Sequence, residues 1–559
     1  ASNVLQYQAD LNKINVFPVN DGDTGSNMAS TIRAVIESVK PDRSYKVTVD
    51  LIAETTLVNA RGNSGIIFAQ FINGVSSETA DLHTITIEHF IDSIKKSVNH
   101  VYQAVANPVE GTMLTIIREW AEFLDKNRSF FHDFNELFLK SKSVLEKALA
   151  ETKHKLDILA KSNVVDAGAN AFVYFIEGII EFINSRNIRQ LMQIKAETEF
   201  VGQIQEHIHE HIEFRFCTEA LISKPLINQT ELSSLVQKYG DSVVVAGTDK
   251  TKRIHVHTNN PDVLFDELKD YGTITFQKAD DMLRQSEAVF NRKWNIALVT
   301  DSACDLSEDL MENYQIHSLP INIYIGENHN LDKVTIKPEQ FFKHLNNSKE
   351  YPKTAQINEV AFRNLYSHLA SHYDAIIAVH LTSKFSGTFF NSKKAAEKAS
   401  AEFKKPIAVI DSKNVSGAIG LIVLRIAKAI EQGLQFDEIV KNAEQWVKDS
   451  RIYVSVKTLD YMVRGGRVSH FKGFIAKLLN VNPIVSMDED GKSMVFGKTY
   501  NQKSNMEKVI QHIKDITKDR KVWNYIVLHA NNPEGAQWYT EKLKLLTNKE
   551  PVSVVNISP

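Results

Sequence analysis

The residues best suited to chemistry stand near the beginning of the chain, where Asp21 and Asp23 are separated by one glycine. A turn over 24–27 follows them, and the apolar periodicity of 28–39 predicts a helix. Carboxylate oxygens suit Mg²⁺, which proteins usually hold with one or two carboxylates together with nucleotide phosphates. Backbone N–H groups at the start of a helix suit those phosphates. The segment therefore predicts a magnesium–nucleotide site.

Helices must position this site. Apolar residues recur at three- and four-residue spacing from residue 28 to about 190, most clearly over 85–106, 145–159 and 171–183. The connections between these runs collect glycine and other small residues at 61–65, 110–112 and 166–169. We expect an all-helical bundle whose polar loops gather at one end.

The rest of the chain alternates strands and helices. Strands are predicted over 214–219, 242–246 and 253–257, in a small α/β unit that ends near residue 290. A third region opens with an apolar strand at 295–300, and Asp305-Leu306-Ser307-Glu308 then predicts a capping box at a helix start. Further strands are predicted, with helices between them, at 375–380, 407–410, 452–455 and 525–528. This alternation predicts an α/β sheet with helices on its faces.

Length and composition limit the classes of protein to consider. A chain of 559 residues is too long for one core, so several domains are expected. A net charge of −3, with no convincing basic patch, argues against a nucleic-acid partner. Two cysteines, Cys217 and Cys304, exclude a disulfide framework and favour a reducing, cytoplasmic location. The most apolar run is interrupted by Glu177 and Glu181, so no membrane span is expected.

A second candidate metal site lies in the middle of the sequence. Cys217 and Glu219 are two residues apart on one predicted strand, and His255 and His257 are two apart on another. Residues with this spacing point to the same face of a strand. Together they offer a tetrahedral ligand set for Zn²⁺. The residues alone leave a second interpretation open, namely paired strand histidines beside a small buried thiol, which is also the interpretation for Cys304.

The segment 15–28 resembles the signature of the ATP-binding subunit of dihydroxyacetone kinases, and more closely the version in bacterial fatty acid kinases. The resemblance continues in order through 61–65, 109–113 and 165–169. It implies an eight-helix barrel with Mg-ATP at its open end. For any one motif alone, turn residues and helix caps remain an alternative explanation. Four ordered motifs together favour the kinase.

This resemblance assigns roles to individual residues. Asp21 and Asp23 would hold one or two magnesium ions and serve catalysis. Asn15 stands where dihydroxyacetone kinases have a third aspartate, and its amide oxygen is a weaker ligand than a carboxylate. The remaining positions implied to contact ATP, the first six at the phosphates and the others around the nucleoside, are Ser26, Asn27, Gly62, Asn63, Ser64, Gly65, Gly111, Thr112, Asp166 and Gly168. The middle domain of fatty acid kinases also has the Cys-Thr-Glu and His-Val-His-Thr segments, which implies metal binding there.

From Asn295 onward the chain resembles the DegV family of fatty-acid-binding proteins. The motifs that carry the resemblance are 299–305, 319–320, 382–388, 410–412 and 461–468. The family implies two α/β lobes that enclose one acyl chain, with hydroxyl groups binding its carboxylate. Transferred to this chain, the carboxylate would be bound by Thr354, Ser386 and Gly387, with Arg467 at the head group as a catalytic and binding residue.

Two departures from the DegV pattern stand out. The family usually reads Thr-Ser-Gln-Pro-Ser where this chain has Thr354-Ala355-Gln356-Ile357-Asn358, so one hydroxyl and the proline are missing. The family also carries a histidine near the carboxylate, whose expected place follows Pro559. We expect further residues beyond both ends of the sequence.

The combined prediction is a multidomain protein. It would have an all-α eight-helix kinase barrel (1–192), a small α/β middle domain (198–290) and a two-lobed α/β DegV-like domain (293–559). The predicted reaction is ATP-dependent phosphorylation of a fatty acid carboxylate to an acyl phosphate, as in phospholipid synthesis. The alternatives are a kinase of a small dihydroxyacetone-like polyol and a non-enzymatic lipid-binding or regulatory protein. ATP, Mg²⁺ and Zn²⁺ are the expected cofactors, with a homodimer through the helical domain and transient membrane contact during lipid loading.

Overall fold

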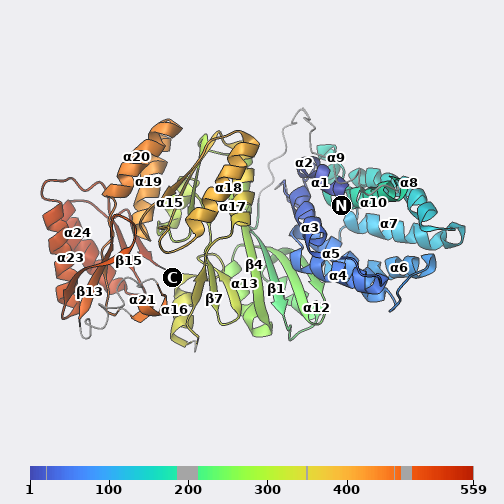
Figure 1. Cartoon of the computed structure of the whole chain (residues 1–559), viewed down its shortest axis with the longest axis horizontal. Coiled ribbons are helices and arrows are strands. Elements are labelled where there is room, and N and C mark those ends of the chain that lie inside the picture. Colours follow the sequence, from blue (N-terminus) through green and yellow to red (C-terminus); the bar gives the residue numbers. More distant parts are fainter. Residues whose placement is uncertain (20–21, 186–211, 348–349, 459, 467–480, 558–559) are drawn as a thin grey trace. The chain divides into compact units, whose positions relative to one another are not determined.

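The computed structural model describes residues 1–19, 22–185, 212–347, 350–458, 460–466 and 481–557. The chain forms two compact units, residues 1–286 and 287–559 (Figure 1). From residue 28 to residue 185 the described chain is helical, as the periodicity predicted, and two short helices precede this region. Its helices are α1 (Ser2–Gln6), α2 (Gln8–Lys13), α3 (Thr24–Ser38), α4 (Tyr45–Asn59), α5 (Gly62–Glu78), α6 (Ile87–Ala104), α7 (Met113–Lys126), η1 (Arg128–Phe130), α8 (Phe134–Lys155), α9 (Asp157–Ser162) and α10 (Ala167–Ser185).

Aromatic side chains form the centre of the helical region. Trp120 of α7 is 1% exposed and lies edge to face with Phe172 of α10, with the ring centroids 5.9 Å apart. Phe71 of α5 meets Phe172 at 5.4 Å, and the Trp120 indole N–H donates to the Ser141 hydroxyl of α8. Buried aromatic pairs of this geometry add stability beyond the area they bury. This core packs α5, α7, α8 and α10 against one another, and so positions the loops at their ends.

One helix expected from the sequence is divided in two. The periodic run 145–159 predicted a continuous helix, but α8 ends at Lys155 and α9 begins at Asp157. Leu156 between them is extended, with φ −127° and ψ 125°. Leu145 of α8 and Leu159 of α9 are both buried, so the apolar spacing of the sequence continues across a break that the spacing itself does not reveal.

The middle domain is a four-stranded antiparallel sheet in the order β2-β3-β1-β4. One face packs on α12 and α13 through residues such as Ile222, Val256 and Phe265. Val244 and Ala246 of β2 pack with Ile66 and Ala69 of α5. The middle sheet is thus docked on the helical region. Its elements are β1 (Phe216–Ser223), α12 (Gln229–Val236), β2 (Gly240–Gly247), β3 (Thr251–Thr258), α13 (Pro261–Leu268), η2 (Lys269–Tyr271), β4 (Thr273–Asp281) and α14 (Met282–Phe290).

The second unit contains a parallel sheet in the order β11-β10-β5-β6. Helices α17, α18 and α19 pack against it, and its apolar strands form the largest core of this unit. The part of the chain between β6 and α17 forms an antiparallel sheet in the order β8-β7-β9. The elements are β5 (Ile296–Asp301), α15 (Glu308–Asn313), β6 (His317–Leu319), β7 (Asn322–Ile325), β8 (Asn328–Leu331), α16 (Pro338–Asn347), β9 (Lys353–Ala355), α17 (Glu359–His372), β10 (Ala375–His380), α18 (Thr388–Phe403), β11 (Ile407–Asp411) and α19 (Gly417–Glu431).

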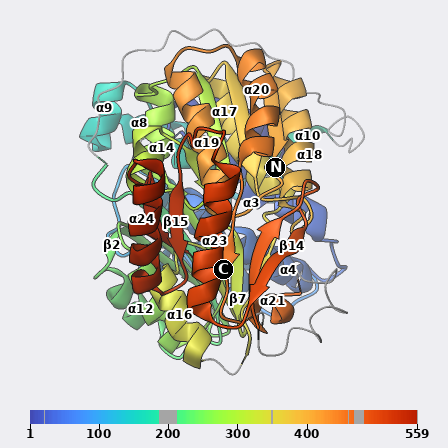
Figure 2. The same ribbon diagram turned by 90° about the vertical axis from the view of Figure 1, so that its left-hand side faces the viewer.

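The last part of the chain builds a smaller core. Helices α23 and α24 lie side by side next to β15, where Val527, Ala536 and Leu543 are buried (Figure 2). The strands form an antiparallel sheet β12-β13-β14 and a parallel pair β15-β16. The elements are α20 (Phe436–Asp449), β12 (Val454–Ser455), α21 (Asp460–Arg464), β13 (Asn482–Met487), β14 (Ser493–Thr499), α23 (Gln502–Ile516), β15 (Ile526–His529), α24 (Pro533–Thr547) and β16 (Ser553–Asn556).

The capping box expected over 305–308 is wrong. Helix α15 begins at Glu308 with Ser307 in the cap position, and no side chain caps it. The carboxylate of Asp305 instead accepts hydrogen bonds from Lys333 and from the Ser416 hydroxyl. These two partners are distant in the sequence, so a local pattern cannot reveal them.

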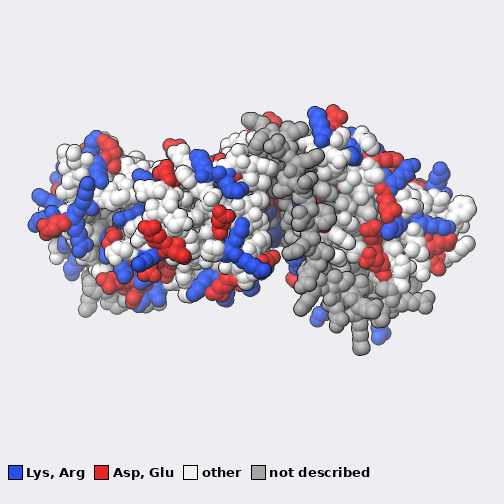
Figure 3. All heavy atoms as spheres, turned by 90° about the horizontal axis from the view of Figure 1, so that it is seen from above, with Lys and Arg blue, Asp and Glu red and all other residues white. Residues whose placement is uncertain are grey.

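Among the described residues, no helix is both long and apolar enough to cross a membrane. On the face drawn in Figure 3, acidic and basic side chains are interspersed over the described residues.

Candidate functional site

The loops of the helical region that carry the four motifs meet one another. A Cβ added to Gly62 would stand 2.4 Å from the Asn27 amide nitrogen, which joins the second motif to the first. A Cβ added to Gly168 would stand 2.7 Å from the Ser64 hydroxyl and 3.5 Å from the Met113 methyl group, which joins the fourth motif to the second and third. These contacts leave no room for a larger side chain at either glycine. The motifs therefore form one constellation at one end of the helices.

The start of α3 is held by the short helix before it. Asp23 stands in the cap position of α3 and makes no capping hydrogen bond there. The Ser26 hydroxyl accepts hydrogen bonds from the amides of Gln8 and Asn12, and the Ser26 N–H donates to Asn12. Asp21 lies outside the described residues, so its predicted role as a magnesium ligand stays a prediction.

Asn15 is buried beside this turn. Its side-chain oxygen accepts a hydrogen bond of 2.8 Å from the Thr24 hydroxyl, and the residue is 2% exposed. That bond fixes the segment ahead of the two aspartates to the first turn of α3. The proposed contribution of Asn15 to magnesium binding is untested, and the observed bond gives the residue a structural role in any case.

The second motif begins α5. Gly62 has a φ of +60°, a left-handed conformation that glycine adopts without strain. The Gly65 N–H donates to the Arg61 carbonyl, while Asn63 and Ser64 occupy the first turn, where a helix supplies no backbone acceptor for their N–H groups. Among the described residues, the Asn63 side-chain oxygen is buried without a hydrogen-bond partner. A bound cation or a ligand donor group would satisfy that oxygen, whereas a phosphate oxygen, being an acceptor, would not.

The third motif is a rigid turn. The Gly111 N–H donates to the Thr115 hydroxyl, and the Thr112 hydroxyl donates to the Val109 carbonyl at 2.8 Å. The Thr115 hydroxyl in turn donates to Glu110, which also receives hydrogen bonds from Tyr102 and Arg118. Gly111 and Thr112 are therefore held in place before any nucleotide binds.

Asp166 of the fourth motif is an ionisable group in an apolar setting. It is 5% exposed, and its carboxylate accepts the Ala169 N–H at 2.7 Å, which caps α10. Burial raises the pKa of Asp166 to about 6, although hydrogen bonds from Ala169 and Met113 oppose the shift. Carboxylates with pKa values raised by burial are enriched at functional sites.

The raised pKa of Asp166 predicts a pH-dependent stability. Between about pH 4 and pH 6 the folded protein keeps a proton that the unfolded chain releases, so the free energy of unfolding falls as the pH rises through this range. Asp166→Asn removes this titration. From pH 4.5 to pH 7 the variant should gain about 2 kcal/mol of stability relative to the wild type, out of the roughly 3 kcal/mol that the whole pKa shift represents. Urea denaturation at both pH values measures the difference.

Asp157→Asn is the matched control, because Asp157 is an exposed aspartate in the first turn of the neighbouring helix α9. It gives the change in stability that the same substitution causes at a surface aspartate at the same two pH values. An Asp166→Asn difference that stays constant between pH 4.5 and pH 7 would contradict the assignment of a raised pKa to Asp166.

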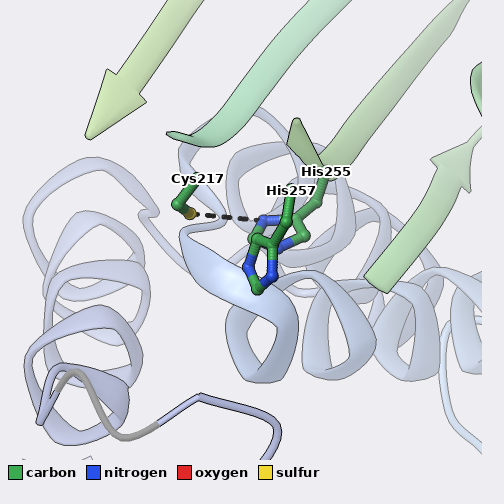
Figure 4. A group of neighbouring side chains, drawn as sticks. All are labelled: Cys217, His255 and His257. Carbon is green, nitrogen blue, oxygen red and sulfur yellow. Dashed lines mark hydrogen bonds between the residues drawn. The ribbon is translucent and has the colours of Figure 1, made fainter. Parts of the chain in front are cut away.

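The predicted middle-domain ligands come together in the described structure. Cys217 of β1 and His255 and His257 of β3 point toward one another, and one ligand atom from each lies within 4.8 Å of the others (Figure 4). Cys217 Sγ and His255 Nδ1 are 3.9 Å apart, and the two imidazole rings meet edge to face. The antiparallel register produces this group because Cys217 pairs directly with His257.

The donor set fits Zn²⁺. Two nitrogens and one sulfur match the ligands of zinc sites that keep a fourth position open, and tetrahedral bonding would separate sulfur from nitrogen by roughly 3.5 Å. The buried Nε2 atom of His255 has no hydrogen-bond partner in the part of the chain that the structure describes. Burial, followed by the neighbouring His257, lowers the pKa of His255 to about 3, which keeps the ring neutral as a metal requires.

The surroundings of the three residues orient them. The Asp241 carboxylate lies 3.5 Å from His257 Nδ1, and the hydrogen bond between them lowers the pKa of Asp241. A carboxylate behind a ligating histidine fixes which ring nitrogen faces the metal. Burial raises the pKa of the Cys217 thiol well above its usual value, so metal binding there would release a proton.

Glu219 is not part of this group in the described structure. One of its carboxylate oxygens accepts the Gly62 N–H at 2.7 Å, and the other is paired with Arg253. Burial opposes ionisation, but Arg253 and Lys278 outweigh it and lower the pKa of Glu219 to about 2. The zinc role predicted for Glu219 therefore has no geometric support, since both oxygens have other partners.

The metal group faces the nucleotide motifs. The carboxylate of Asp23 is close enough to Cys217 to raise the pKa of the thiol, as a minor contribution beside burial. Glu219, two residues further along the same face of β1, contacts Gly62. The sheet of the middle domain thus presents its metal ligands toward the same end of the helices at which the four motifs meet.

Arg253 and Asp241 were missed by the sequence interpretation. Arg253 has the same two-residue spacing from His255 as His257 does, so it shares their face of β3, and this spacing could have revealed it. Asp241 gave no such signal, because its place opposite His257 follows from the strand register.

The predicted acyl-carboxylate residues are in the second unit. Thr354 is in β9, and Ser386 precedes α18, where its hydroxyl bonds to the Thr388 hydroxyl at 2.8 Å. The two segments adjoin, because a Cβ added to Gly387 would overlap the Gln356 side-chain oxygen at 1.9 Å. A larger residue at Gly387 would therefore require the Gln356 side chain to move. Arg467 lies outside the described residues.

Three protein-family descriptions match the chain. Residues 18–181 match the DAK2 domain, and residues 213–289 match a middle domain described as fatty acid kinase-like. Residues 295–559 match the DegV family, described as uncharacterised.

Curated relatives match different parts of the chain. An uncharacterized protein of Mycoplasma pneumoniae is 31% identical over 340 residues, which cover 55% of this chain and 60% of that protein. An uncharacterized protein of Staphylococcus saprophyticus is 29% identical over 303 residues, which cover 52% and 54%. The chain thus spans little more than half the length of these two relatives.

Proteins described as DegV proteins are similar to the carboxyl-terminal part of this chain. Among solved structures, DegV from Bacillus subtilis, described as a fatty acid binding protein, is 29% identical over 47% of this chain and 92% of that chain, with a TM-score of 0.42. A DegV domain-containing protein of Caldanaerobacter subterraneus is 35% identical over 239 residues, which cover 43% of this chain and 84% of that protein. The chain therefore belongs to the DegV family, with a DAK2 domain and a fatty acid kinase-like middle domain ahead of the DegV part in the same polypeptide.

Proposed function

We propose that this chain transfers the γ-phosphoryl group of ATP to the carboxylate of a fatty acid. One observation carries the proposal: the four nucleotide motifs meet at one end of the helical region, in a polypeptide that also contains a DegV domain. A separate acyl-carrier protein would then be unnecessary. We also propose that the helical region forms the eight-helix barrel of the related kinases, and that the DegV part forms two lobes that enclose the acyl chain.

In the proposed reaction a carboxylate oxygen attacks the γ-phosphorus while the bond to the bridging oxygen of ADP breaks. The products are an acyl phosphate and ADP. Asp21 and Asp23, with Asn15, would hold magnesium, which when bound neutralises charge on the phosphates. The N–H groups of Asn63 and Ser64 would bind phosphate oxygens. Phosphoryl transfer needs positioning and charge neutralisation more than covalent chemistry, and these residue types are suited to both.

The three residues Cys217, His255 and His257 would hold Zn²⁺ beside this centre. A zinc ion with an open position supplies Lewis-acid chemistry when bound. All three residues are buried, and Asp241 orients His257. Their direction toward the nucleotide motifs supports a role in the same reaction.

A fatty acid explains why an acyl-binding domain is joined to a kinase. Each buried methylene contributes about 0.8 kcal/mol, so a long acyl chain gains on the order of 10 kcal/mol when it is sheltered from water. The DegV part would shelter the tail and expose the carboxylate, which Thr354 and Ser386 would bind, with Arg467 at the head group. We also propose a homodimer formed through the helical region.

Two measurements test the proposed function. Mass spectrometry of lipid extracted from the purified protein should reveal a fatty acid, and ATP with added fatty acid should yield a hydroxamate in the presence of hydroxylamine. Phosphorylation of dihydroxyacetone in preference to fatty acid would favour the small-polyol kinase. Bound lipid without hydroxamate formation would favour a lipid-binding or regulatory protein.

Ser386→Ala should weaken binding of the acyl carboxylate. A hydrogen bond to a charged group contributes about 1.5–3 kcal/mol, so the KM for fatty acid should rise roughly tenfold or more with little change in the KM for ATP. Ser400→Ala in α18 is the matched control, because the Ser400 hydroxyl bonds only locally, to the Lys405 carbonyl. Initial rates of hydroxamate formation measure both constants, and an unchanged KM for fatty acid in Ser386→Ala would refute the carboxylate assignment.

A further inference from the structure

The corner between α4 and α5, residues 58–62, is held by one buried ion pair from the middle sheet. The side chains of Arg253 and Glu219 are 2% and 0% exposed. Arg253 donates to the Val58 carbonyl at 3.1 Å and to the Ala60 carbonyl at 2.6 Å. Glu219 accepts the Gly62 N–H at 2.7 Å. The pair therefore reaches both sides of the corner.

The charges of the pair match the two helix ends that it contacts. The last carbonyls of a helix carry partial negative charge and the first N–H groups carry partial positive charge. The Arg253 guanidinium meets the end of α4, and the Glu219 carboxylate meets the start of α5. Removing an ion pair from water is costly unless further hydrogen bonds offset the loss. Here both carboxylate oxygens of Glu219 and both terminal nitrogens of Arg253 are hydrogen-bonded, while Arg253 Nε is buried without a partner among the described residues.

The same corner is tied to the first nucleotide motif. The Arg61 N–H donates to the Thr31 hydroxyl at 3.2 Å, and that hydroxyl donates to the Asn27 carbonyl at 2.8 Å. The Asn27 amide lies directly against Gly62. A displacement of the corner would therefore shift residues of both phosphate-contacting motifs.

The pair also determines which backbone donors are used within the protein. The Gly62 N–H is bonded to Glu219 and the Gly65 N–H to the Arg61 carbonyl. Between them, Asn63 and Ser64 supply the first-turn N–H groups that the proposed function assigns to phosphate. Glu219 thus holds the loop from one side without occupying those two donors.

We propose that Glu219 and Arg253 are positioning residues for the phosphate-binding loop, so that the middle domain is a working part of the kinase site. This inference rests on the proposed function, because it concerns the same nucleotide site. It assigns Glu219 to the phosphate-binding loop and leaves zinc to Cys217, His255 and His257. Neither Glu219 nor Arg253 needs to touch the nucleotide for this role.

The test compares two substitutions across the same contact between the helical region and the middle sheet. Glu219→Ala removes the acceptor for the Gly62 N–H. Gln70→Ala removes the acceptor for the Gly247 N–H, a hydrogen bond of 3.0 Å. This bond also joins α5 to the middle sheet, but it does not involve residues 58–65. Calorimetry with Mg-ATP on the full chain measures the Kd, and elemental analysis measures the zinc content, so neither readout needs an acyl acceptor.

We expect Glu219→Ala to raise the Kd for Mg-ATP at least tenfold, whereas Gln70→Ala lowers the melting temperature and leaves the Kd within twofold of the wild type. Zinc content should be unchanged in both. An unaltered Kd in Glu219→Ala would overturn the positioning role. Loss of zinc in Glu219→Ala would also overturn it, by returning Glu219 to the metal group.

Glu219→Ala leaves the Arg253 charge buried without its partner, which alone can prevent folding. The double variant Glu219→Leu with Arg253→Met removes both charges together, and the same tenfold rise in Kd is expected from it at a melting temperature near that of the wild type. A wild-type Kd in this folded double variant would overturn the proposal. Absence of Mg-ATP binding by the wild type would instead refute the kinase function, and this result is seen before any variant is made.

Discussion

Asp23→Asn should lower the rate of acyl phosphate formation by at least about 10³-fold while the protein stays folded. The substitution keeps the shape of the side chain and removes the charge that would bind magnesium. Metal-assisted charge stabilisation contributes several kcal/mol to such reactions, and each 1.36 kcal/mol is a factor of ten in rate. Asp23 makes no capping hydrogen bond to α3, so the substitution removes no cap from this helix. The hydroxamate assay with ATP and fatty acid measures the rate.

Asp133→Asn is the control for the same chemical change at another helix start. Asp133 caps α8 through a hydrogen bond from the Glu136 N–H, and asparagine caps helices equally well. This variant should keep the wild-type rate. A wild-type rate in Asp23→Asn, with an unchanged melting temperature, would disprove the magnesium assignment of Asp23.

Cys217→Ser should abolish stoichiometric zinc binding. A serine hydroxyl replaces the only sulfur of the three-residue group, and zinc sites depend strongly on thiolate ligands. Substitution of a residue that only hydrogen-bonds to a metal ligand lowers metal affinity by about 10–100-fold. Loss of a direct ligand should therefore weaken zinc binding by at least roughly 10²-fold. Equilibrium dialysis against a chromogenic zinc chelator measures the affinity, and elemental analysis measures the content after chelator washing.

Cys304→Ser is the matched control, since Cys304 is the other buried cysteine of the chain and lies in the second unit. It should retain the zinc content of the wild type. Equal zinc in Cys217→Ser and the wild type would show that the metal binds elsewhere, and a wild type without zinc after mild purification would remove the basis for a zinc site at Cys217, His255 and His257.

Periodicity was sufficient to predict the classes of structure along the chain. The helices from residue 28 to residue 185 and the strands near 253–257 and 375–380 were expected from spacing alone. The break at Leu156 was not, because the apolar spacing continues across it. Periodicity reports which side is buried, and it does not report where the backbone changes direction.

Side-chain partners distant in the sequence were harder to predict. Asp305 has the local surroundings of a capping residue, yet it bonds to Lys333 and Ser416. Glu219 has the same spacing from Cys217 as the two histidines have from each other, which suggested a fourth zinc ligand. Its carboxylate is held by Arg253 and Gly62 instead. In both cases a stronger partner at long range outweighs the local pattern.

The sequence by itself determined the residue types and the faces on which they lie. Alternation requires Cys217 and Glu219 to lie on one face of their strand, and Arg253, His255 and His257 to lie on one face of theirs, whatever their partners are. Only the tertiary structure decided that the two sets share one face of the sheet, and how that face divides into a metal group and an ion pair at the α4–α5 corner. The physical reason is that strand register and domain docking are set by the sum of many apolar contacts, which no local spacing encodes.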